Sequence, residues 1–380
     1  MPEPPPSTLG EQSPVRLCYV HCYRDPDYTR ARCQIEALRT MPGVELQLAA
    51  TRRRGLWRYG ELIAELWRAH RRPRPDAYLL GFRGHELFWL IRLLAGRRPV
   101  ILDALMSPGS SLREEAKAGA AGLLLAPLVC ALERRVLLAA DVVLTDTPHH
   151  AAHYHVAFGV PYASIVPIPV GAVECDAPAP IPGKSFRVLF YGSFLPLHGV
   201  DVILRAASLL RELDIDFVFV GGTRRAAKRL EARCRELGVT RYTHAPWMAF
   251  EDLIERVIPA ADLCLGGPFG DTPQSRRVVT TKTTQCLALG RPTVVGALAG
   301  DVGFRDRDNC FVVPQDDPAA LAEAIRWAFE HRQDLPALGE RGRALYRQRF
   351  GPEAIAAGLQ EALRRALNHP GPRAGREPRR

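Results

Sequence analysis

The fold of this chain is decided by one stretch of its second half, Arg187-Val-Leu-Phe-Tyr-Gly-Ser-Phe-Leu-Pro-Leu-His-Gly-Val-Asp-Val-Ile-Leu-Arg-Ala-Ala207. An apolar run stops at Gly192, a loop follows, and a segment with helical periodicity comes after it. The pattern predicts a buried strand, a loop and a helix. Glycine lets the backbone approach a ligand, and free amides at a helix start point into such a loop, so the stretch predicts an anion site.

A second strand-first pattern opens the first half at Val15-Arg-Leu-Cys-Tyr-Val20. Short apolar runs then alternate with helical segments, which is typical of α/β doubly wound domains. We expect strands at 15–20, 44–48, 77–81, 99–103, 141–145 and 164–168, and then at 187–191, 216–222, 263–265, 292–296 and 311–313. We expect helices at 27–40, 57–70, 224–237, 282–289, 318–331 and 350–367. The fold prediction is two Rossmann-like domains facing a central cleft, where the carboxyl ends of both sheets gather ligand groups.

A chain of 380 residues suits two domains, and the Pro-rich region after Val173 is the best candidate for the linker between them. The predicted boundaries are a disordered leader (1–14), an N-terminal domain (15–172), a linker (173–184), a C-terminal domain (185–350), a last helix returning to the N-terminal domain (351–368), and a disordered basic tail (369–380).

The formal net charge of +10 is concentrated in two patches. Residues 51–75 carry eight arginines against Glu61 and Glu65, and the tail is also basic. The Arg52–Arg74 segment contains Trp57 and Trp67, and two hypotheses fit it: a surface that lies on an anionic bilayer, or a solvated helical face. No nucleic-acid module accompanies it, so we expect no nucleic-acid partner.

Nine scattered cysteines without a CxxC pair indicate buried thiols in a reducing compartment, with neither a disulfide framework nor a zinc site. The N-terminus lacks the features of a signal peptide. The uncharged run Ala118–Leu132 is short for a membrane span and contains Pro127, so we interpret it as a buried helix. We expect a cytoplasmic protein, with a peripheral position on the inner face of the membrane if the bilayer hypothesis holds.

Five blocks of sequence, in this order and spacing, resemble a family 4 glycosyltransferase of the GT-B type (glycosyl transferases group 1). They are Leu132-Glu-Arg-Arg with Ala140-Asp-Val-Val-Leu-Thr145; Val166-Pro-Ile-Pro-Val-Gly171; Tyr191-Gly-Ser-Phe-Leu-Pro-Leu-His-Gly199; Ala261-Asp-Leu-Cys-Leu-Gly-Gly-Pro-Phe-Gly-Asp-Thr-Pro273; and Lys282-Thr-Thr-Gln-Cys-Leu-Ala-Leu-Gly-Arg-Pro292. The resemblance covers most of residues 15–367. It implies transfer of a sugar from a nucleotide-diphosphate sugar to a glycan, lipid-linked or small-molecule acceptor, as in polysaccharide or cell-envelope biosynthesis. It also implies retention of anomeric configuration, with no metal and no cofactor besides the nucleotide-sugar substrate.

Such a reaction builds negative charge on the leaving diphosphate, so fixed hydrogen-bond donors are needed there. The resemblance implies catalytic roles for Lys282 and His198, and we add Asp103, at the end of a strand in the first half, to orient hydroxyl groups. The implied donor-binding residues are Gly192, Ser193, Gly199, Gly221, Trp247, Gly270, Asp271, Thr272, Thr283 and Gln285. Trp247 is expected beside the nucleobase and Gln285 beside the ribose hydroxyls.

The chain departs from the family pattern at four places. Ser193 and His198 stand where the family usually has Arg and Lys. Arg277 replaces a Glu that usually contacts the transferred sugar, and Gln285 replaces a Glu that usually binds the ribose hydroxyls. Bland alternatives stay open: the glycines can serve turns and packing, Asp103 can be structural, and Trp247 can be core. One rival function is a GT-B domain that binds nucleotide sugar or glycan without turnover. Another is sugar-nucleotide epimerisation, which would form product without an acceptor but needs acid and base groups that the motifs do not provide.

Overall fold

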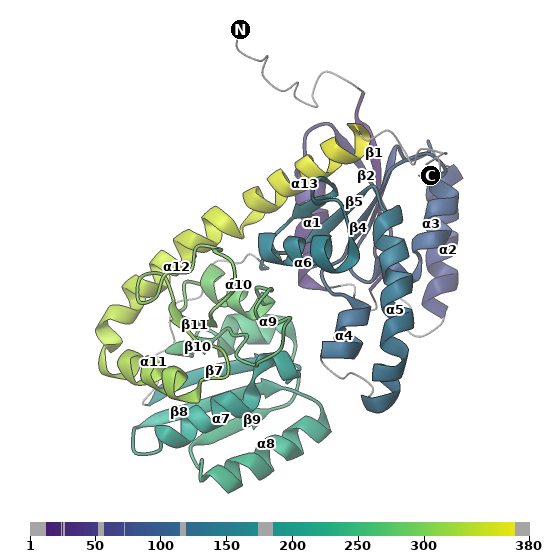
Figure 1. Cartoon of the computed structure of the whole chain (residues 1–380). Coiled ribbons are helices and arrows are strands. Elements are labelled where there is room, and N and C mark those ends of the chain that lie inside the picture. Colours follow the sequence, from purple (N-terminus) through teal and green to yellow (C-terminus); the bar gives the residue numbers. More distant parts are fainter. Residues whose placement is uncertain are drawn as a thin grey trace. The chain divides into compact units, whose positions relative to one another are not determined.

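The computed structural model describes residues 13–23, 25, 27–51, 57–71, 73–114, 119–173 and 185–368, which form two compact units (Figure 1). Described residues up to Arg113, from 119 to Ile168 and from Ile355 onward belong to unit 1. Glu114 and residues Pro169–Ala354 belong to unit 2. Most of the predicted leader and linker, the whole predicted tail, and Arg52, Arg53, Arg54 and Arg72 lie outside the described residues.

Unit 1 is built on a six-stranded parallel sheet in the order β2-β1-β3-β4-β5-β6. The strands are β1 (Val15–Val20), β2 (Val44–Ala49), β3 (Ala77–Leu80), β4 (Val100–Asp103), β5 (Val142–Thr145) and β6 (Ile165–Pro167). Every residue of β3, β4 and β5 is buried. Their sequences, apolar except for Asp103 at the end of β4 and Thr145 at the end of β5, fit this position, because helices cover both faces of a parallel sheet.

Two layers of helices cover that sheet. The helices are α1 (Thr29–Thr40), α2 (Trp57–Arg71), α3 (Phe88–Ala95), α4 (Pro108–Glu114), α5 (Gly119–Ala139), α6 (Pro148–Phe158) and α13 (Pro352–Asn368), with 3-10 turns at Gly84–Glu86 and Tyr162–Ser164. Buried residues of α2, α3, α5 and α6 share one apolar cluster, and those of α1 and α13 share another. The last helix, α13 (yellow in Figure 1), therefore completes the core of unit 1 with Ile355, Leu359 and Leu363.

Helix α5 contradicts the expectation that the uncharged run Ala118–Leu132 forms a buried helix. Its buried positions are confined to one side, at Gly122, Ala126, Glu133, Val136 and Leu137. Leu124 on the other side is 82% exposed. The apolar sequence alone did not reveal this, because a helix that is apolar all round has no polar face to mark which side meets solvent.

Unit 2 contains a second six-stranded parallel sheet, in the order β12-β11-β10-β7-β8-β9. The strands are β7 (Phe186–Gly192), β8 (Ile215–Gly221), β9 (Tyr242–Ala245), β10 (Leu263–Leu265), β11 (Thr293–Gly296) and β12 (Phe311–Val313). The helices are α7 (Val200–Leu209), α8 (Arg224–Leu237), α9 (Phe250–Asp252), α10 (Thr281–Ala288), α11 (Pro318–Glu330) and α12 (Leu335–Arg349), with shorter turns at Pro196–His198, Leu253–Val257 and Arg332–Asp334.

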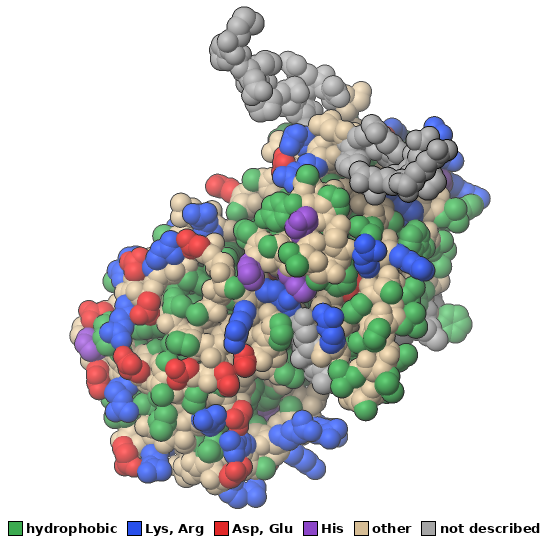
Figure 2. All heavy atoms as spheres, viewed as in Figure 1, with side chains coloured by type: hydrophobic (Ala, Val, Ile, Leu, Met, Phe, Trp, Pro, Cys, Tyr) green, Lys and Arg blue, Asp and Glu red, His purple; other side chains and the backbone are tan. Residues whose placement is uncertain are grey.

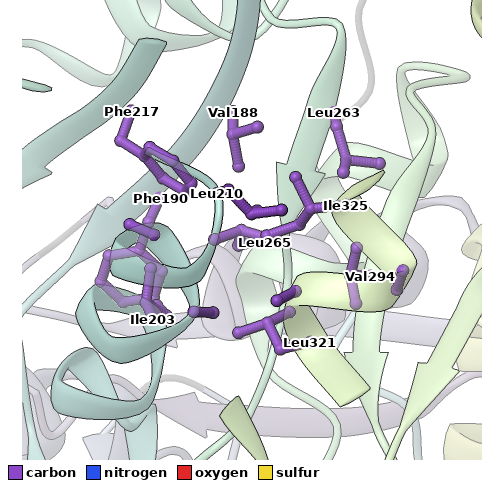
Figure 3. Packing of buried hydrophobic residues seen from close by; sticks show 14 of the residues in the cluster. Val188, Phe190, Ile203, Leu210, Phe217, Leu263, Leu265, Val294, Leu321 and Ile325 are labelled. Carbon is purple, nitrogen blue, oxygen red and sulfur yellow. The ribbon is translucent and has the colours of Figure 1, made fainter. Parts of the chain in front are cut away.

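The largest apolar cluster of unit 2 lies between its sheet and helices α7 and α11. Figure 3 shows Val188 and Phe190 of β7 near Ile203 of α7, with Leu321 and Ile325 of α11 beyond them. Each fully buried side chain of this size contributes roughly 1.5–3 kcal/mol to folding. The cluster thus fixes β7 and α7, and with them the loop that joins the two.

The two parallel sheets confirm the predicted α/β fold class. The expected strands and helices are present, and their ends differ from the expected ranges by a few residues. Helices α3, α4, α6 and α9 lie in segments for which no helix was expected. Residues 335–349, which the sequence analysis assigned to no element, form α12. No helix among the described residues is long and apolar enough to cross a membrane. None of the eight cysteines in the described part of the chain is in a disulfide bond.

Candidate functional site

The carboxyl ends of β7 and β8 meet at two paired glycines. Gly192 and Gly221 are register partners, and both have positive φ angles, 142° and 100°. The N–H of Gly222 donates to the carbonyl of Gly192 over 2.8 Å. A Cβ atom at Gly221 would collide with that carbonyl oxygen, so this position requires glycine. We call Gly192 and Gly221 the glycine edge.

The loop after β7 packs against the loop after β10. A turn at Pro196–His198 leads into Gly199, which has φ of 65° and begins α7. The N–H of Gly270 donates to the carbonyl of Leu197 over 3.0 Å. A Cβ at Gly199 would lie 2.6 Å from the Gly270 nitrogen, so Gly199 serves this close backbone packing. The contact brings two of the predicted donor-binding loops together.

Lys282 and His198 meet beneath Gly192. Lys282 lies in the first turn of α10, whose N-cap Thr280 accepts a hydrogen bond from the Thr283 N–H over 3.2 Å. The Lys282 Nζ atom is 3.0 Å from His198 Nε2 and 5.6 Å from the centre of the Phe190 ring. A Cβ at Gly192 would be 3.5 Å from that Nζ. The two predicted catalytic residues of unit 2 therefore form one cluster at the end of β7.

The hydrogen bonds around His198 favour an uncharged amine on Lys282. The Leu195 N–H donates to His198 Nδ1 over 3.2 Å, which leaves the imidazole proton on Nε2. An Nε2–H group can donate to the lone pair of a neutral amine but not to an ammonium. Burial agrees with this, because it lowers the pKa of Lys282 to about 7. An arriving anion would restore the charge, since an opposite charge nearby raises the pKa of an amine.

Aromatic side chains surround the glycine edge. Trp247, which follows β9, is 59% exposed, and its indole would lie 3.4 Å from a Cβ at Gly221. His244 Nε2 is 2.9 Å from the Gly221 carbonyl and donates to it. The ring of Phe194, a residue with φ of 56°, lies against Gly222. An exposed indole beside a backbone edge offers a flat surface on which a nucleobase can stack.

Residues 185–331 match the family model described as glycosyl transferases group 1. This stretch holds Gly192, His198, Trp247 and Lys282. The chain contains a glycosyl transferases group 1 domain.

The solved structures that resemble this glycosyltransferase have the GT-B fold of such enzymes. Sucrose-phosphate synthase from Thermosynechococcus elongatus matches with a TM-score of 0.71 at 17% identity, over 93% of this chain and 98% of its own. HepE from Anabaena, in complex with UDP-glucose, matches with a TM-score of 0.67 at 15% identity, over 92% and 99%. The lipopolysaccharide outer core galactosyltransferase WaaB matches with a TM-score of 0.55 at 12% identity, over 92% and 99%. A search of curated protein sequences gives no match.

The enzyme takes its sugar from a nucleotide sugar, as group 1 glycosyltransferases do. The glycine edge, Trp247 and the Lys282–His198 pair are close enough to serve one ligand in unit 2. Phe194 and His244 belong to the same surroundings and were not predicted. Phe194 was visible inside the quoted loop, but the positive φ angle that turns its ring toward Gly222 leaves no sign in the sequence.

The loop after Gly270 uses most of its polar groups internally. Thr272 and Ser275 exchange hydrogen bonds of 3.1 Å between each side chain and the other's N–H. Asp271 forms an exposed ion pair of 2.6 Å with Arg276. Ser193 is exposed in the loop after β7, and Arg277 is buried. This arrangement keeps Gly270 against Leu197 and Gly199 of the loop after β7, and leaves Asp271 at the surface.

Two predicted donor-binding residues of α10 have contacts inside unit 2. Thr283 is fully buried, and its hydroxyl lies 3.2 Å from the carbonyl of Gly267. Gln285 is also fully buried, and its side-chain amide pairs with both backbone groups of Val173, at 2.9 and 3.0 Å. A ribose contact by Gln285 would require that pair to open.

Asp103 lies in unit 1 and is held by an ion pair. Its carboxylate accepts hydrogen bonds from Arg30 at 2.7 and 3.0 Å and from Gln34 at 2.9 Å. Both members of the ion pair are buried, Arg30 completely. The sequence analysis did not single out Arg30 or Gln34, because a basic and an amide residue in a helix look like surface positions. Among the described residues, no group of three or more His, Cys, Asp or Glu side chains is placed to hold a metal ion.

Proposed function

We propose that the enzyme transfers a hexose-type sugar from a nucleoside-diphosphate sugar to a glycan, lipid-linked or small-molecule acceptor, with retention and without a metal ion. The observation that carries this proposal is the Lys282–His198 pair beneath Gly192. It is a buried basic cluster at the carboxyl end of a sheet, in a domain of the group 1 family. HepE, which has the same fold, was solved with UDP-glucose, and this supports a nucleotide sugar as the donor.

The proposed chemistry uses Lys282 as the principal stabiliser of the leaving group. The acceptor oxygen attacks the anomeric carbon, the bond from that carbon to the diphosphate oxygen breaks, and the acceptor proton passes to the diphosphate. Lys282, protonated in the presence of the anion, donates to the oxygen that gains charge, and His198 Nε2–H donates beside it. The glycine edge lets the phosphates approach the backbone, and Trp247 stacks on the base. In this proposal acceptors bind unit 1.

A second candidate function is binding of the nucleotide sugar without turnover. It is favoured by Gln285, whose amide is committed to Val173, and by Arg277 in place of the usual Glu. Both observations concern contacts to ribose and to the transferred sugar, whereas the basic cluster concerns the diphosphate. The two candidates therefore differ in turnover and agree in affinity for a nucleoside diphosphate.

Titration calorimetry and thermal shift with UDP, GDP and ADP, and with their sugars, would test both candidates in buffer containing EDTA. At a hundredfold excess over Kd, a ligand raises the stability of the native state by about 2.7 kcal/mol. We expect one nucleoside diphosphate to bind with the metal chelated. Sugar release or transfer in the same mixture would support the enzyme, and binding without product would support the second candidate. Absence of binding by any of these nucleotides would refute both.

We further propose that the enzyme acts in the cytoplasm at the inner face of a membrane, through the Arg52–Arg74 segment. Its described part is α2, in which Arg58 pairs with Glu86 over 2.7 Å and Arg71 lies 5.1 Å from the centre of the Trp67 ring. Buried cysteine thiols such as Cys18, Cys264 and Cys286 fit a reducing compartment. The test is sedimentation with anionic vesicles, in which replacing Arg52, Arg53 and Arg54 by Ala should weaken binding.

A further inference from the structure

Helix α5 presents leucines to solvent along its length. Leu124, Leu128 and Leu132, at intervals of four residues, are 82%, 59% and 50% exposed. That spacing aligns them as one stripe on the helix. The exposed leucines of α5 are Leu123, Leu124, Leu125, Leu128, Leu132 and Leu138. A single exposed leucine needs no explanation, but a contiguous exposed apolar surface indicates an interaction site.

The neighbouring helices extend this surface with tryptophans. Helices α2, α3 and α5 connect successive strands in the order β2, β3, β4 and β5, and they share one apolar cluster on one face of the sheet. Their exposed large apolar side chains besides the leucines of α5 are Trp57, Ile63, Trp67, Trp89 and Leu93. We call the exposed residues of these three helices the outer helical face. In Figure 2 hydrophobic side chains, in green, cover most of the visible part of α5.

The charges on the outer helical face have one sign. Within the described residues of α2, α3 and α5, every exposed charged side chain is an arginine: Arg68, Arg71, Arg134 and Arg135. Glu133 is buried beneath α5, and Glu65 is half-buried beside Arg68. Leucines and tryptophans mixed with arginines, without exposed carboxylates, complement an anionic lipid surface, where apolar side chains enter the acyl boundary and arginines meet headgroups.

We propose that the outer helical face lies on an anionic lipid bilayer, with α5 in the plane of the interface and its leucine stripe buried among the acyl chains. This deepens the membrane proposal made above and rests on it for the partner. It assigns the main contact to α5 in place of the Arg52–Arg74 segment alone. It does not depend on sugar transfer, because none of these residues belongs to the donor site.

Vesicle sedimentation of the full chain with Leu124→Gln, Leu128→Gln and Leu132→Gln combined would test the proposal. The substitutions are at exposed positions, so the fold should survive, as far-UV circular dichroism and the nucleotide-induced thermal shift would verify. Matched controls are Val156→Gln on α6 and Leu209→Gln on α7, whose side chains are 81% and 54% exposed. We expect the triple variant to lower partition into phosphatidylglycerol vesicles roughly a hundredfold, since partial burial of each leucine contributes up to about tenfold. The controls should bind like the wild type.

The outcomes separate this inference from the broader membrane proposal. Failure of the wild type to sediment with phosphatidylglycerol vesicles would refute both. Loss of binding in the Arg52, Arg53 and Arg54 variant, with the leucine variant unchanged, would refute α5 and keep the arginine segment. Analytical ultracentrifugation of the wild type tests a second copy as the occupant. The lipid assignment would be overturned if the wild type forms a dimer, the leucine substitutions dissociate it, and neither protein binds vesicles. A blue shift of tryptophan emission on vesicle addition, absent in the triple variant, would support it.

Discussion

Each unit buries a basic side chain at the carboxyl edge of its sheet or beneath it, and the two side chains are neutralised differently. Arg30 of unit 1 is fully buried and forms a two-pronged ion pair with Asp103. Burial lowers the pKa of Arg30, but the Asp103 carboxylate more than offsets that, and the net shift is upward. Lys282 of unit 2 is buried beside the neutral imidazole of His198, and its pKa falls to about 7.

The difference shows that unit 1 supplies the counter-charge for its buried basic side chain and that the described residues of unit 2 do not. The ion pair of unit 1 is complete within the folded protein, so Asp103 and Arg30 hold structure together. Among the described residues, Lys282 has no ion pair with a carboxylate. A site that buries a basic group without a counter-ion is favourable for an anionic ligand, which would bring the negative charge that protonated Lys282 needs. The comparison therefore predicts a structural cost in one unit and a catalytic cost in the other.

The largest effect is expected at the complete ion pair. Asp103→Asn leaves the buried guanidinium of Arg30 without its counter-charge, which should lower the free energy of unfolding by about 3–5 kcal/mol. Urea denaturation followed by tryptophan emission would measure it. Asp76→Asn, which breaks a half-buried, partly solvated pair with Arg16, is the control and should cost only about 0–1 kcal/mol. Unchanged stability with lost turnover would instead make Asp103 a substrate-binding residue.

At Lys282 we expect a loss of turnover without a loss of stability. Lys282→Met removes the donor to the leaving diphosphate, so turnover should fall by roughly 10²–10³. The free energy of unfolding should stay the same or rise, because the variant no longer buries an amine in apolar surroundings. Steady-state kinetics and urea denaturation would be compared with Lys228→Met, an exposed position on α8. Wild-type turnover in the Lys282 variant would refute its role.

Unit 1 also buries a carboxyl group, Glu133, that has no full counter-charge among the described residues, and its effect on stability should depend on pH. Burial raises the pKa of Glu133 to about 7, against the hydrogen bonds from Gly109 and Ser107 that lower it. The folded state then keeps a proton that the unfolded chain releases near its ordinary value of 4.5. The contribution of Glu133 to stability should therefore fall as pH rises from about 4.5 to 7, by about 3 kcal/mol in total. Neighbouring His85 contributes an opposite slope, because burial lowers its pKa to about 4, so the wild type is compared with a variant that changes Glu133 alone. Glu133→Gln should remove the Glu133 slope, and urea midpoints across that pH range would show whether it does.

The smallest effect is expected at Gln285. Gln285→Ala breaks both hydrogen bonds to Val173 and should cost about 1–2 kcal/mol of stability. Calorimetry with UDP and 2′-deoxy-UDP would separate this structural role from a ribose contact. If the wild type prefers UDP and the variant loses that preference, Gln285 turns to the ribose during binding. An equal preference in both proteins confines Gln285 to the Val173 contact.

The fold and the centre of the site were accessible from the sequence because their signals are local. Apolar runs bounded by turns gave the strands, and the motif from Tyr191 to Gly199 gave the loop that holds His198. The contacts that were missed all depend on partners distant in the chain. Arg30 and Asp103 are separated by 73 residues, and Gln285 and Val173 by 112. No periodicity reports such pairs, and none reported which side of α5 meets solvent.

The position of helix α13 in unit 1 also determines the order in which the two units can finish folding during synthesis. The first unit in the sequence lacks part of its interior until Ile355, Leu359 and Leu363, near the end of the chain, have left the ribosome. Unit 2, whose residues run almost without interruption to Ala354, has its whole sequence available earlier. The half that is synthesised first is thus completed last. A truncation before residue 355 would damage the amino-terminal half of the enzyme while sparing the half in which the cut was made.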